Sequence, residues 1–273
     1  MTQTLTSQSA QPARVVLVTG ASSGIGYATC LYFAKQGWYV AGTARSADKL
    51  DALQREINAL APASAAFLPV TADVRDADAM RSAVDQVMST FGRLDVLVAN
   101  AGVGHRGPVV DAQWDDLDTL LRTNIDGVLH SIRTAVPAMR KNGAGQIILV
   151  SSVVWNMVSP YAVLYAASKA FVSSLARSLR FELESDHIAV TDLRIGRVQT
   201  NFSANRLGTS GRSKSAGFLP EMTPEQVAVA IFEAVGSRRP IVTLRWLDRL
   251  LILANRLFPN QIGQRASGQY KPD

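Results

Sequence analysis

The sequence predicts an open, doubly wound α/β fold in which a parallel sheet is covered by helices on both faces. Short apolar runs of strand length alternate with helix-length segments along most of the 273 residues. These runs are continuously apolar rather than alternating with polar residues, which is typical of parallel strands buried on both faces. A glycine-rich segment follows the first run, where a doubly wound fold binds a ligand.

Each expected strand is a short apolar or β-branched run bounded by turn-forming residues. The first strand enters the glycine-rich segment, and the helix after it spans residues 25–36 and stops at Gly37, a residue type that ends helices. The expected strands are residues 14–19, 38–43, 66–71, 94–99, 146–151 and 188–193, with residues 241–244 as a last short strand. The chain shows no internal repeat and no strong linker, so we expect one domain.

Composition fits a single globular domain. Hydrophobic residues make up 47% of the chain and charged residues 18%, which permits a large core. Residues 1–12 lack the basic start and apolar run of a signal peptide, so we expect a flexible polar tail there and the domain over residues 13–273. The single cysteine, Cys30, fits a reducing compartment, and we expect a cytoplasmic protein without a membrane-spanning helix.

The glycine-rich segment lies between the first strand and the first helix. Backbone N–H groups and the helix dipole favour a pyrophosphate there, and glycine lets the phosphate approach closely. A flexible turn is the alternative interpretation of a glycine pattern, and the strand and helix on either side favour the dinucleotide site. The cofactor-binding residues expected in this segment are Gly20, Ser22, Ser23, Gly24, Ile25 and Gly26.

Tyr165 and Lys169 lie four residues apart in the segment Tyr-Ala-Ala-Ser-Lys, and Ser152 lies thirteen residues before the tyrosine. Residues i and i+4 share a helix face, so we expect the Lys169 ammonium to lower the pKa of the Tyr165 phenol from its usual value of about 10. The phenol would then be a usable proton donor and acceptor. The structural alternatives are a strand-end serine, a core tyrosine and a solvated lysine.

Further motifs follow one another along the chain. They are Thr-Gly-x3-Gly-x-Gly at residues 19–26, Asp73-Val74, Asn-Ala-Gly at residues 100–102, Asn124, Ser152 and Tyr165-x3-Lys169. In this order they resemble the short-chain dehydrogenase/reductase family, over about residues 14–200. The resemblance implies one Rossmann-like domain with a seven-stranded parallel sheet.

The resemblance also implies a role for each catalytic residue. Tyr165 would exchange a proton with the substrate oxygen, and Ser152 would donate a hydrogen bond to that oxygen. Lys169 would bind the nicotinamide ribose, and Asn124 would extend a proton relay through a water. The cofactor would supply the hydride. This scheme needs no metal, and three histidines without ligand spacing indicate none.

The end of the second strand indicates which nicotinamide cofactor is bound. NAD-specific sites place an acid against the ribose 2′-hydroxyl, and residues 43–46 contain no acid. The Arg45 guanidinium can pair with a 2′-phosphate, and Ser46 can add a hydroxyl contact. We therefore expect NADP rather than NAD, the alternative for Arg45 being a surface arginine. Ser23 departs from this pattern, because some NADP-dependent relatives carry a basic residue there.

Further cofactor contacts are implied by the resemblance. They involve Asp73 and Val74 at the adenine, Asn100, Ala101 and Gly102 below the cofactor, Tyr165 and Lys169, and Val198 and Thr200 at the nicotinamide and phosphates. The chain departs from the family at Ala99, where an asparagine is usual, and at Ile195, where a proline precedes the glycine. Because the missing proline would fix φ, we expect a mobile loop after the sixth strand.

The expected substrate pocket is mostly apolar. Its candidate residues are Val154, Trp155, Met157, Tyr161 and Phe202. They favour an aliphatic, aromatic or steroid-like ketone or aldehyde, or the matching alcohol, although each could equally be a core residue. We expect His105 to be an exposed loop residue, the alternative being a hydrogen bond to the substrate. We expect residues 201–218 to form a substrate loop that closes over the site, with a disordered surface loop as the alternative.

The C-terminal segment 244–258 is amphipathic and basic. Residues 201–273 carry ten basic and five acidic side chains, within a net charge of +6. The apolar stripe consists of Trp246, Leu247, Leu250, Leu251, Ala254, Leu257 and Phe258, and the basic side of Arg245, Arg249 and Arg256. We expect the stripe to pack near the substrate entrance, with peripheral membrane contact as the alternative.

The sequence thus predicts an NADP-dependent oxidoreductase that interconverts a carbonyl and an alcohol. A cofactor-binding regulator is one alternative, which the intact serine, tyrosine and lysine disfavour. A peripheral membrane enzyme of lipid metabolism is another. We expect no nucleic-acid partner, and the resemblance implies a homodimer or homotetramer formed through the long helices around residues 114–140 and 161–184.

Overall fold

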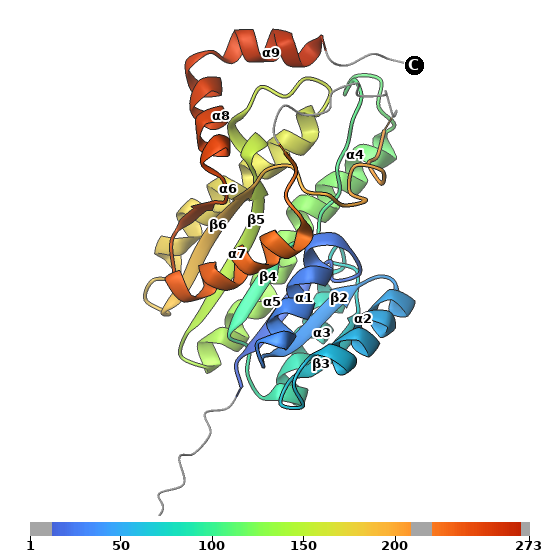
Figure 1. Cartoon of the computed structure of the whole chain (residues 1–273), viewed down its shortest axis with the longest axis vertical. Helices are drawn as coiled ribbons and strands as arrows, with labels where there is room; N and C mark the ends of the chain where they lie inside the picture. The colour runs from blue at the N-terminus through green and yellow to red at the C-terminus, as the bar shows by residue number, and fades with distance from the viewer. Residues whose placement is uncertain (1–12, 209–219, 269–273) are drawn as a thin grey trace, which may run out of the picture.

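The computed structural model describes residues 13–208 and 220–268, and in it strands and helices alternate along the chain (Figure 1). The strands are β1 Val15–Thr19, β2 Tyr39–Ala44, β3 Ala66–Thr71, β4 Val96–Ala99, β5 Gly145–Ser152, β6 Ile188–Ile195 and β7 Ile241–Thr243. The helices are α1 Gly24–Lys35, α2 Ala47–Leu60, α3 Ala77–Phe91, α4 Trp114–Leu121, α5 Gly127–Lys141, α6 Val163–Glu182, α7 Pro224–Ser237, α8 Trp246–Leu257 and α9 Pro259–Ser267. A π-helical turn, η1 Arg122–Asp126, precedes α5, and a 3₁₀ turn, η2 Val153–Asn156, follows β5.

The strands form one seven-stranded sheet in the order β3-β2-β1-β4-β5-β6-β7, and every neighbouring pair is parallel. The predicted doubly wound sheet is therefore confirmed. Strand order reverses between β1 and β4, which lie side by side with Val16 opposite Val96. Ligands of such sheets bind beyond the carboxyl ends of the strands at this reversal.

Helices cover both faces of the sheet, which explains why the strands are continuously apolar. Successive residues of a strand point to opposite faces. Val16 and Val18 of β1 pack in one buried cluster with α1, α2 and α7. Val15 and Leu17 pack in a second cluster with α3, α5 and α6. The first four positions of β1 therefore each face a packed layer, and an apolar residue is favoured at each.

Strand β6 carries a buried ion pair in the middle of this apolar sheet. Asp192 is fully buried and accepts hydrogen bonds from Arg194 Nε at 2.7 Å, Ser173 Oγ at 2.6 Å and the Ser151 hydroxyl. The Arg194 guanidinium lies 4.2 Å from the ring centroid of Trp155, a stacking distance. The pair satisfies its own polar atoms and fixes the Trp155 side chain after β5.

Helix α8 leaves much of its apolar stripe exposed. Its buried residues are polar: Asp248 is 0% exposed, and Asn255 Oδ1 accepts a hydrogen bond of 3.1 Å from the Val158 amide. Large apolar side chains point outward instead, namely Trp246, Leu250, Leu253, Leu257 and Phe258. Polar contacts to the segment around η2 therefore anchor the helix, and packing of the apolar stripe near the substrate entrance stays a prediction. No helix in the described part of the chain is long and apolar enough to cross a membrane.

Candidate active site

The glycine-rich turn is shaped by close backbone contacts. Gly20 and Gly24 have φ of +71° and +55°, where a side chain is disfavoured, and a Cβ on Gly26 would collide with the Gly20 carbonyl oxygen. Thr19 Oγ1 accepts hydrogen bonds from the amides of Asn100 and Ala101, at 3.0 and 3.1 Å. The loop after β4 therefore holds the end of β1, and the turn leaves the open N-terminus of α1 that a pyrophosphate needs.

Thr200 and Val198 lie on the segment that follows β6. A Cβ on Gly24 would lie 3.0 Å from Thr200 Cγ2, so this segment meets the glycine-rich turn. Val198 forms a parallel bridge with Met222, which fixes its backbone beside the start of α7. The structure thus brings together the glycine-rich turn, the Asn100 loop and Thr200, and the cradle fits a dinucleotide.

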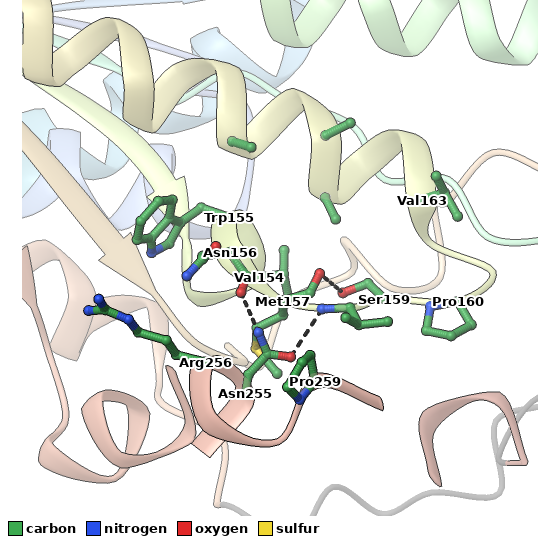
Figure 2. Close-up of a pocket in the computed structure, with 14 residues that line it drawn as sticks. Val154, Trp155, Asn156, Met157, Ser159, Pro160, Val163, Asn255, Arg256 and Pro259 are labelled. Carbon is green, nitrogen blue, oxygen red and sulfur yellow. Dashed lines mark hydrogen bonds between the residues drawn. The ribbon is translucent and has the colours of Figure 1, made fainter. Parts of the chain in front are cut away.

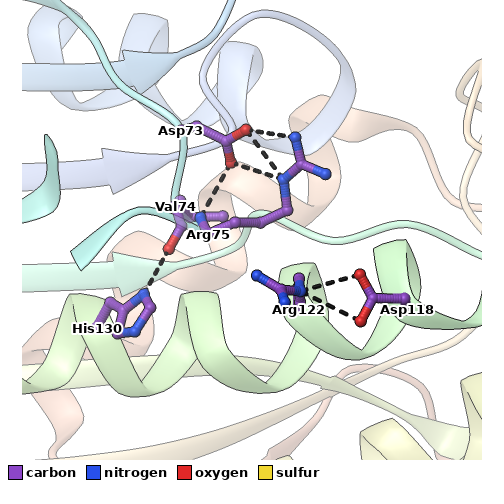
Figure 3. A network of polar contacts seen from close by, with 6 residues as sticks. All are labelled: Asp73, Val74, Arg75, Asp118, Arg122 and His130. Carbon is purple, nitrogen blue, oxygen red and sulfur yellow. Dashed lines mark hydrogen bonds and ion pairs between the residues drawn. The ribbon is translucent and has the colours of Figure 1, made fainter. Parts of the chain in front are cut away.

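The carboxylate of Asp73 is held by a residue that sequence reasoning missed (Figure 3). Arg75 Nη2 and Nε donate to Asp73 Oδ2 at 2.7 and 3.0 Å. Burial raises the pKa of Asp73, but the hydrogen bonds from Arg75 and the charge of Arg45 outweigh it and lower that pKa. Arg45 therefore lies close to Asp73, at the end of β2. The neighbouring Val74 carbonyl oxygen lies 3.0 Å from His130 Nδ1.

Ser152, Tyr165 and Lys169 come together where β5 ends and α6 begins. Lys169 is 6% exposed, and its Nζ donates to the Val150 carbonyl oxygen at 2.9 Å. The same Nζ lies 5.8 Å from the ring centroid of Tyr165. The Ser152 hydroxyl lies within hydrogen-bonding reach of the Tyr165 phenol and also donates to the Ile195 carbonyl oxygen at 3.2 Å. Strand β5 and helix α6 thus deliver all three side chains to one place.

Burial controls the protonation of this group more than charge does. Burial raises the pKa of Tyr165 to about 12, against smaller lowering effects from the Ser152 hydrogen bond and the Arg206 charge. Burial lowers the pKa of Lys169 to about 8, although the Asp192 carboxylate opposes that shift. The lowered Tyr165 pKa expected from the sequence was therefore wrong for this structure, because desolvation of the phenol exceeds the effect of nearby charge.

Asn124 lies in the π-helical turn η1 and is 1% exposed. Its Oδ1 accepts from the Val103 amide at 2.8 Å, and its Nδ2 donates to the Val103 carbonyl oxygen and Ser168 Oγ, both at 3.0 Å. The side chain therefore ties the loop after β4 to helix α6, which carries Tyr165 and Lys169. The proton-relay role of Asn124 stays a prediction.

The expected substrate residues divide between two places. Val154, Trp155 and Met157 line an open groove of about 730 Å³ between η2, α6 and the α8–α9 corner (Figure 2). The described residues lining it do not include Ser152, Tyr165 or Lys169.

The other two expected substrate residues lie outside this groove. The Phe202 ring centroid lies 5.7 Å from that of Tyr165, next to the reactive phenol. Tyr161 has φ of +60°, and its carbonyl oxygen accepts a hydrogen bond of 2.8 Å from the Gly107 amide. Phe202 is therefore an expected substrate residue whose ring lies beside a catalytic side chain.

The remaining expectations concern His105, two segments at the edges of the described residues, and metal binding. His105 is 3% exposed rather than a surface residue, because its backbone bridges Leu207. The substrate loop expected over residues 201–218 is described only as far as Gly208, and the polar tail over residues 1–12 lies outside the described residues. Across residues 13–208 and 220–268, no cluster of three or more His, Cys, Asp or Glu could hold a metal ion.

Comparisons with known proteins agree with this geometry. The short chain dehydrogenase family matches residues 14–210. Dehydrogenase/reductase SDR family member 7B of Bos taurus is 33% identical over 238 residues, which cover 84% of this chain and 73% of that protein.

Solved structures are similar as well. An alcohol dehydrogenase from the archaeon Thermococcus sibiricus, complexed with 5-hydroxy-NADP, matches with TM-score 0.73 and 26% identity over 85% of this chain and 96% of its own. A 3-ketoacyl-(acyl-carrier-protein) reductase from Brucella melitensis, complexed with NADH, matches with TM-score 0.74 and 27% identity over 85% and 94%. The chain therefore belongs to the short-chain dehydrogenase/reductase family.

Proposed function

We propose that this protein is an NADP(H)-dependent oxidoreductase that interconverts a carbonyl and an alcohol on a small to medium apolar substrate. The proposal rests on one observation: Ser152, Tyr165 and Lys169 lie close together beside a glycine-rich turn of the dinucleotide-binding type. When bound, the nicotinamide would supply or accept the hydride. The relatives named above include an alcohol dehydrogenase and a ketoacyl reductase, which act on these two groups.

The chain's own residues would handle the proton. A Tyr165 phenol with a pKa of about 12 holds its proton at neutral pH and can donate it to the oxygen of a reduced carbonyl. The Ser152 hydroxyl would donate a second hydrogen bond to that oxygen and stabilise its developing charge. The Lys169 ammonium would bind the cofactor ribose and support the tyrosinate left after proton transfer.

Tyr165→Phe tests this function. We expect a loss of about 10²- to 10⁴-fold in NADPH-dependent reduction of a panel of ketones and aldehydes, because the variant lacks the proton donor. NADPH binding, measured by nucleotide fluorescence, should persist. The control is Tyr32→Phe, which removes a hydroxyl from a tyrosine on α1 whose ring packs against Phe232 of α7, and it should keep its turnover. Near-normal turnover of Tyr165→Phe would contradict the assignment, and a wild type that binds NADPH but reduces nothing would favour the regulator.

The preference for NADP rests on Arg45. This residue is exposed directly after β2, and an acid whose pKa its charge affects, Asp73, is already paired with Arg75. The positive charge of Arg45 is thus left to meet a 2′-phosphate. Arg45→Asp should lower the ratio of NADPH to NADH catalytic efficiency by about ten- to a hundredfold, the value of one or more charge-assisted hydrogen bonds. Arg55→Asp on α2 is the charge-matched control; an equal ratio in wild type and Arg45→Asp would refute the preference.

The remaining features of the proposal concern substrate and surroundings. Phe202 beside Tyr165 and the apolar side chains of η2 support an apolar aliphatic, aromatic or steroid-like substrate. We also propose a cytoplasmic homodimer or homotetramer. The outward apolar side chains of α8 favour one alternative, an enzyme on a membrane surface, and cosedimentation with anionic vesicles at physiological salt distinguishes the two.

A further inference from the structure

Two segments far apart in the chain form a short parallel ladder beside Tyr165, which we call the arginine clip and define as residues 104–106 and 206–207. The Leu207 amide donates to the Gly104 carbonyl oxygen at 2.9 Å, and the Arg106 amide donates to the Leu207 carbonyl oxygen at 3.0 Å. Side chains alternate along an extended segment, so His105 and Leu207 share one face of the clip. Arg106 and Arg206 share the other.

Arg206 lies close to the reactive phenol. A Cβ on Gly104 would be 3.0 Å from both Arg206 Cγ and Phe202 Cε1, so the arginine stem and the phenylalanine ring lie against the same backbone. The Phe202 ring in turn lies 5.7 Å from the Tyr165 ring. The guanidinium charge also acts electrostatically on the phenol: it lowers the pKa of Tyr165, in opposition to burial. Gly104, which has no side chain, makes this approach possible.

Within residues 13–208 and 220–268, no acid balances the positive charge of Arg206. Its guanidinium is half-buried, and Nη2 donates to Ser203 Oγ at 2.5 Å. Burial lowers the pKa of Arg206, and the charges of Arg106 and Arg197 lower it further. Arg197 is paired with Glu221 at 2.7 Å, whereas no acidic side chain of the described residues pairs with Arg206.

The stretch of sequence directly after Gly208 adds no acid either. Residues 209–219 contain Arg212 and Lys214 but no Asp or Glu. A partly buried cation without a counter-ion is unfavourable, and an anionic ligand removes that cost. Arginine also matches the planar or trigonal oxygens of carboxylate, sulfonate and phosphate groups.

We infer that Arg206 is an anion subsite of the substrate pocket, so that the substrate is a carbonyl compound or alcohol carrying a carboxylate, sulfonate or phosphate group away from the reacting carbon. This narrows the proposed function, on which it rests, to an apolar molecule with one acidic end. The apolar part would contact Phe202, the carbonyl oxygen would meet Tyr165, and the acidic group would pair with Arg206.

Ligand binding to the NADPH-bound enzyme tests the subsite without turnover. The probes are benzoate, benzenesulfonate and phenyl phosphate, with neutral benzamide as the reference, measured by calorimetry. We expect the wild type to bind at least one anion more tightly than benzamide, and the probe that binds best identifies the acidic group. Arg206→Gln should weaken the binding of that anion by about ten- to a hundredfold, and Arg206→Lys should retain part of the affinity. Benzamide affinity should change little in both variants.

Arg81→Gln is the matched control, since Arg81 is an exposed arginine on α3 paired with Asp78. It should bind the anions like the wild type. Equal anion binding by Arg206→Gln and the wild type would overturn the subsite, as would a wild type that prefers benzamide to all three anions. The NADPH affinity of Arg206→Gln, measured separately, shows whether Arg206 contacts the cofactor instead. A loss of NADPH affinity with unchanged anion binding would also overturn the subsite.

Turnover separates the subsite from the proposed function. The substrates are 3- and 4-formylbenzoate and their methyl esters, in which a methyl group replaces the negative charge. The wild type should prefer the acid of at least one pair, and Arg206→Gln should reduce the acid-to-ester ratio of kcat/KM about tenfold, a ratio in which any effect on Tyr165 cancels. Reduction of the esters without a preference for the acids contradicts the subsite alone. Failure to reduce any aldehyde, with anion binding intact, contradicts the proposed function alone.

Discussion

At the residue scale, burial favours the neutral forms of both Tyr165 and Lys169. The pKa of the phenol rises to about 12 and that of the ammonium falls to about 8. A protonated phenol suits carbonyl reduction, in which the enzyme donates a proton to the new alcohol. Lys169 stays charged only below about pH 8, so the pair of a neutral tyrosine and a charged lysine exists at neutral pH and is lost as the solution becomes alkaline.

The pH dependence of reduction follows from these two values. We expect kcat/KM for carbonyl reduction to be level below about pH 7 and to fall as pH rises through about 8, because Lys169 loses its proton there while Tyr165 keeps its own. Steady-state rates with NADPH between pH 6 and 10 measure this profile. Lys169→Arg, if active, should move the decline to higher pH, since a guanidinium stays charged. A wild-type profile that is level through pH 9 would contradict the prediction.

At the element scale, the start of helix α8 packs against the loop that follows β6. Arg245 Nη2 and Nε donate to the buried Asp248 carboxylate at 2.6 and 2.9 Å, and Arg245 also donates to the Pro220 carbonyl oxygen. This ion pair lies directly against Gly196. The missing proline at Ile195 led us to expect a mobile loop, whereas the structure packs a buried ion pair against the glycine beside it.

Gly196→Ala tests that packing. Its Cβ would lie 2.5 Å from Arg245 Nη2 and 2.8 Å from Asp248 Oδ2, so the ion pair must shift. We expect a loss of about 1–3 kcal/mol in unfolding free energy, as for other overpacked sites, and a Tm lower by several degrees. Gly236→Ala is the control, because its Cβ on α7 meets nothing within 4 Å and should be neutral or stabilising. Equal Tm values for Gly196→Ala and the wild type would contradict the prediction, because they would show that the loop accommodates the added methyl group without loss of stability.

Elements could be predicted from the sequence where a local pattern decides them. The apolar runs gave the strands, and the spacing of Tyr165 and Lys169 placed both on one helix, as found. Contacts between distant segments could not be predicted in this way. Arg206 meets Gly104 only through the arginine clip, and Asp248 becomes buried only because α8 returns to the loop after β6. The Tyr165 pKa likewise depends on burial by surrounding segments, which residue spacing does not reveal.

At the scale of the whole molecule, the outer face of α6 is notable for its small and apolar side chains. Most of its exposed positions are small or apolar, namely Val163, Ala167, Phe171, Ser174, Ser178 and Phe181, and charged residues stand only near its C-terminal end, at Arg177 and Glu182. The small and apolar positions recur at helical spacing and form one continuous face opposite the buried residues Val172, Ala176 and Leu179. Small residues let two helices approach closely. The face therefore supports the proposed homo-oligomer, in which α6 of one chain would pack against α6 of a second copy.

Phe171→Glu tests this assembly. Phe171 is 37% exposed, near the middle of the outer face, and a carboxylate there would be buried without a partner in a dimer that covers about 1,200–2,000 Å². We expect light scattering to give the mass of one chain for this variant and a multiple of it for the wild type. The catalytic side chains lie on another face of α6, so NADPH binding by the variant reports that each chain remains folded. Leu60→Glu, which adds the same charge at a 53% exposed leucine on α2, should keep the wild-type mass. A Phe171→Glu protein with the wild-type multiple would place the contact between copies elsewhere on the molecule.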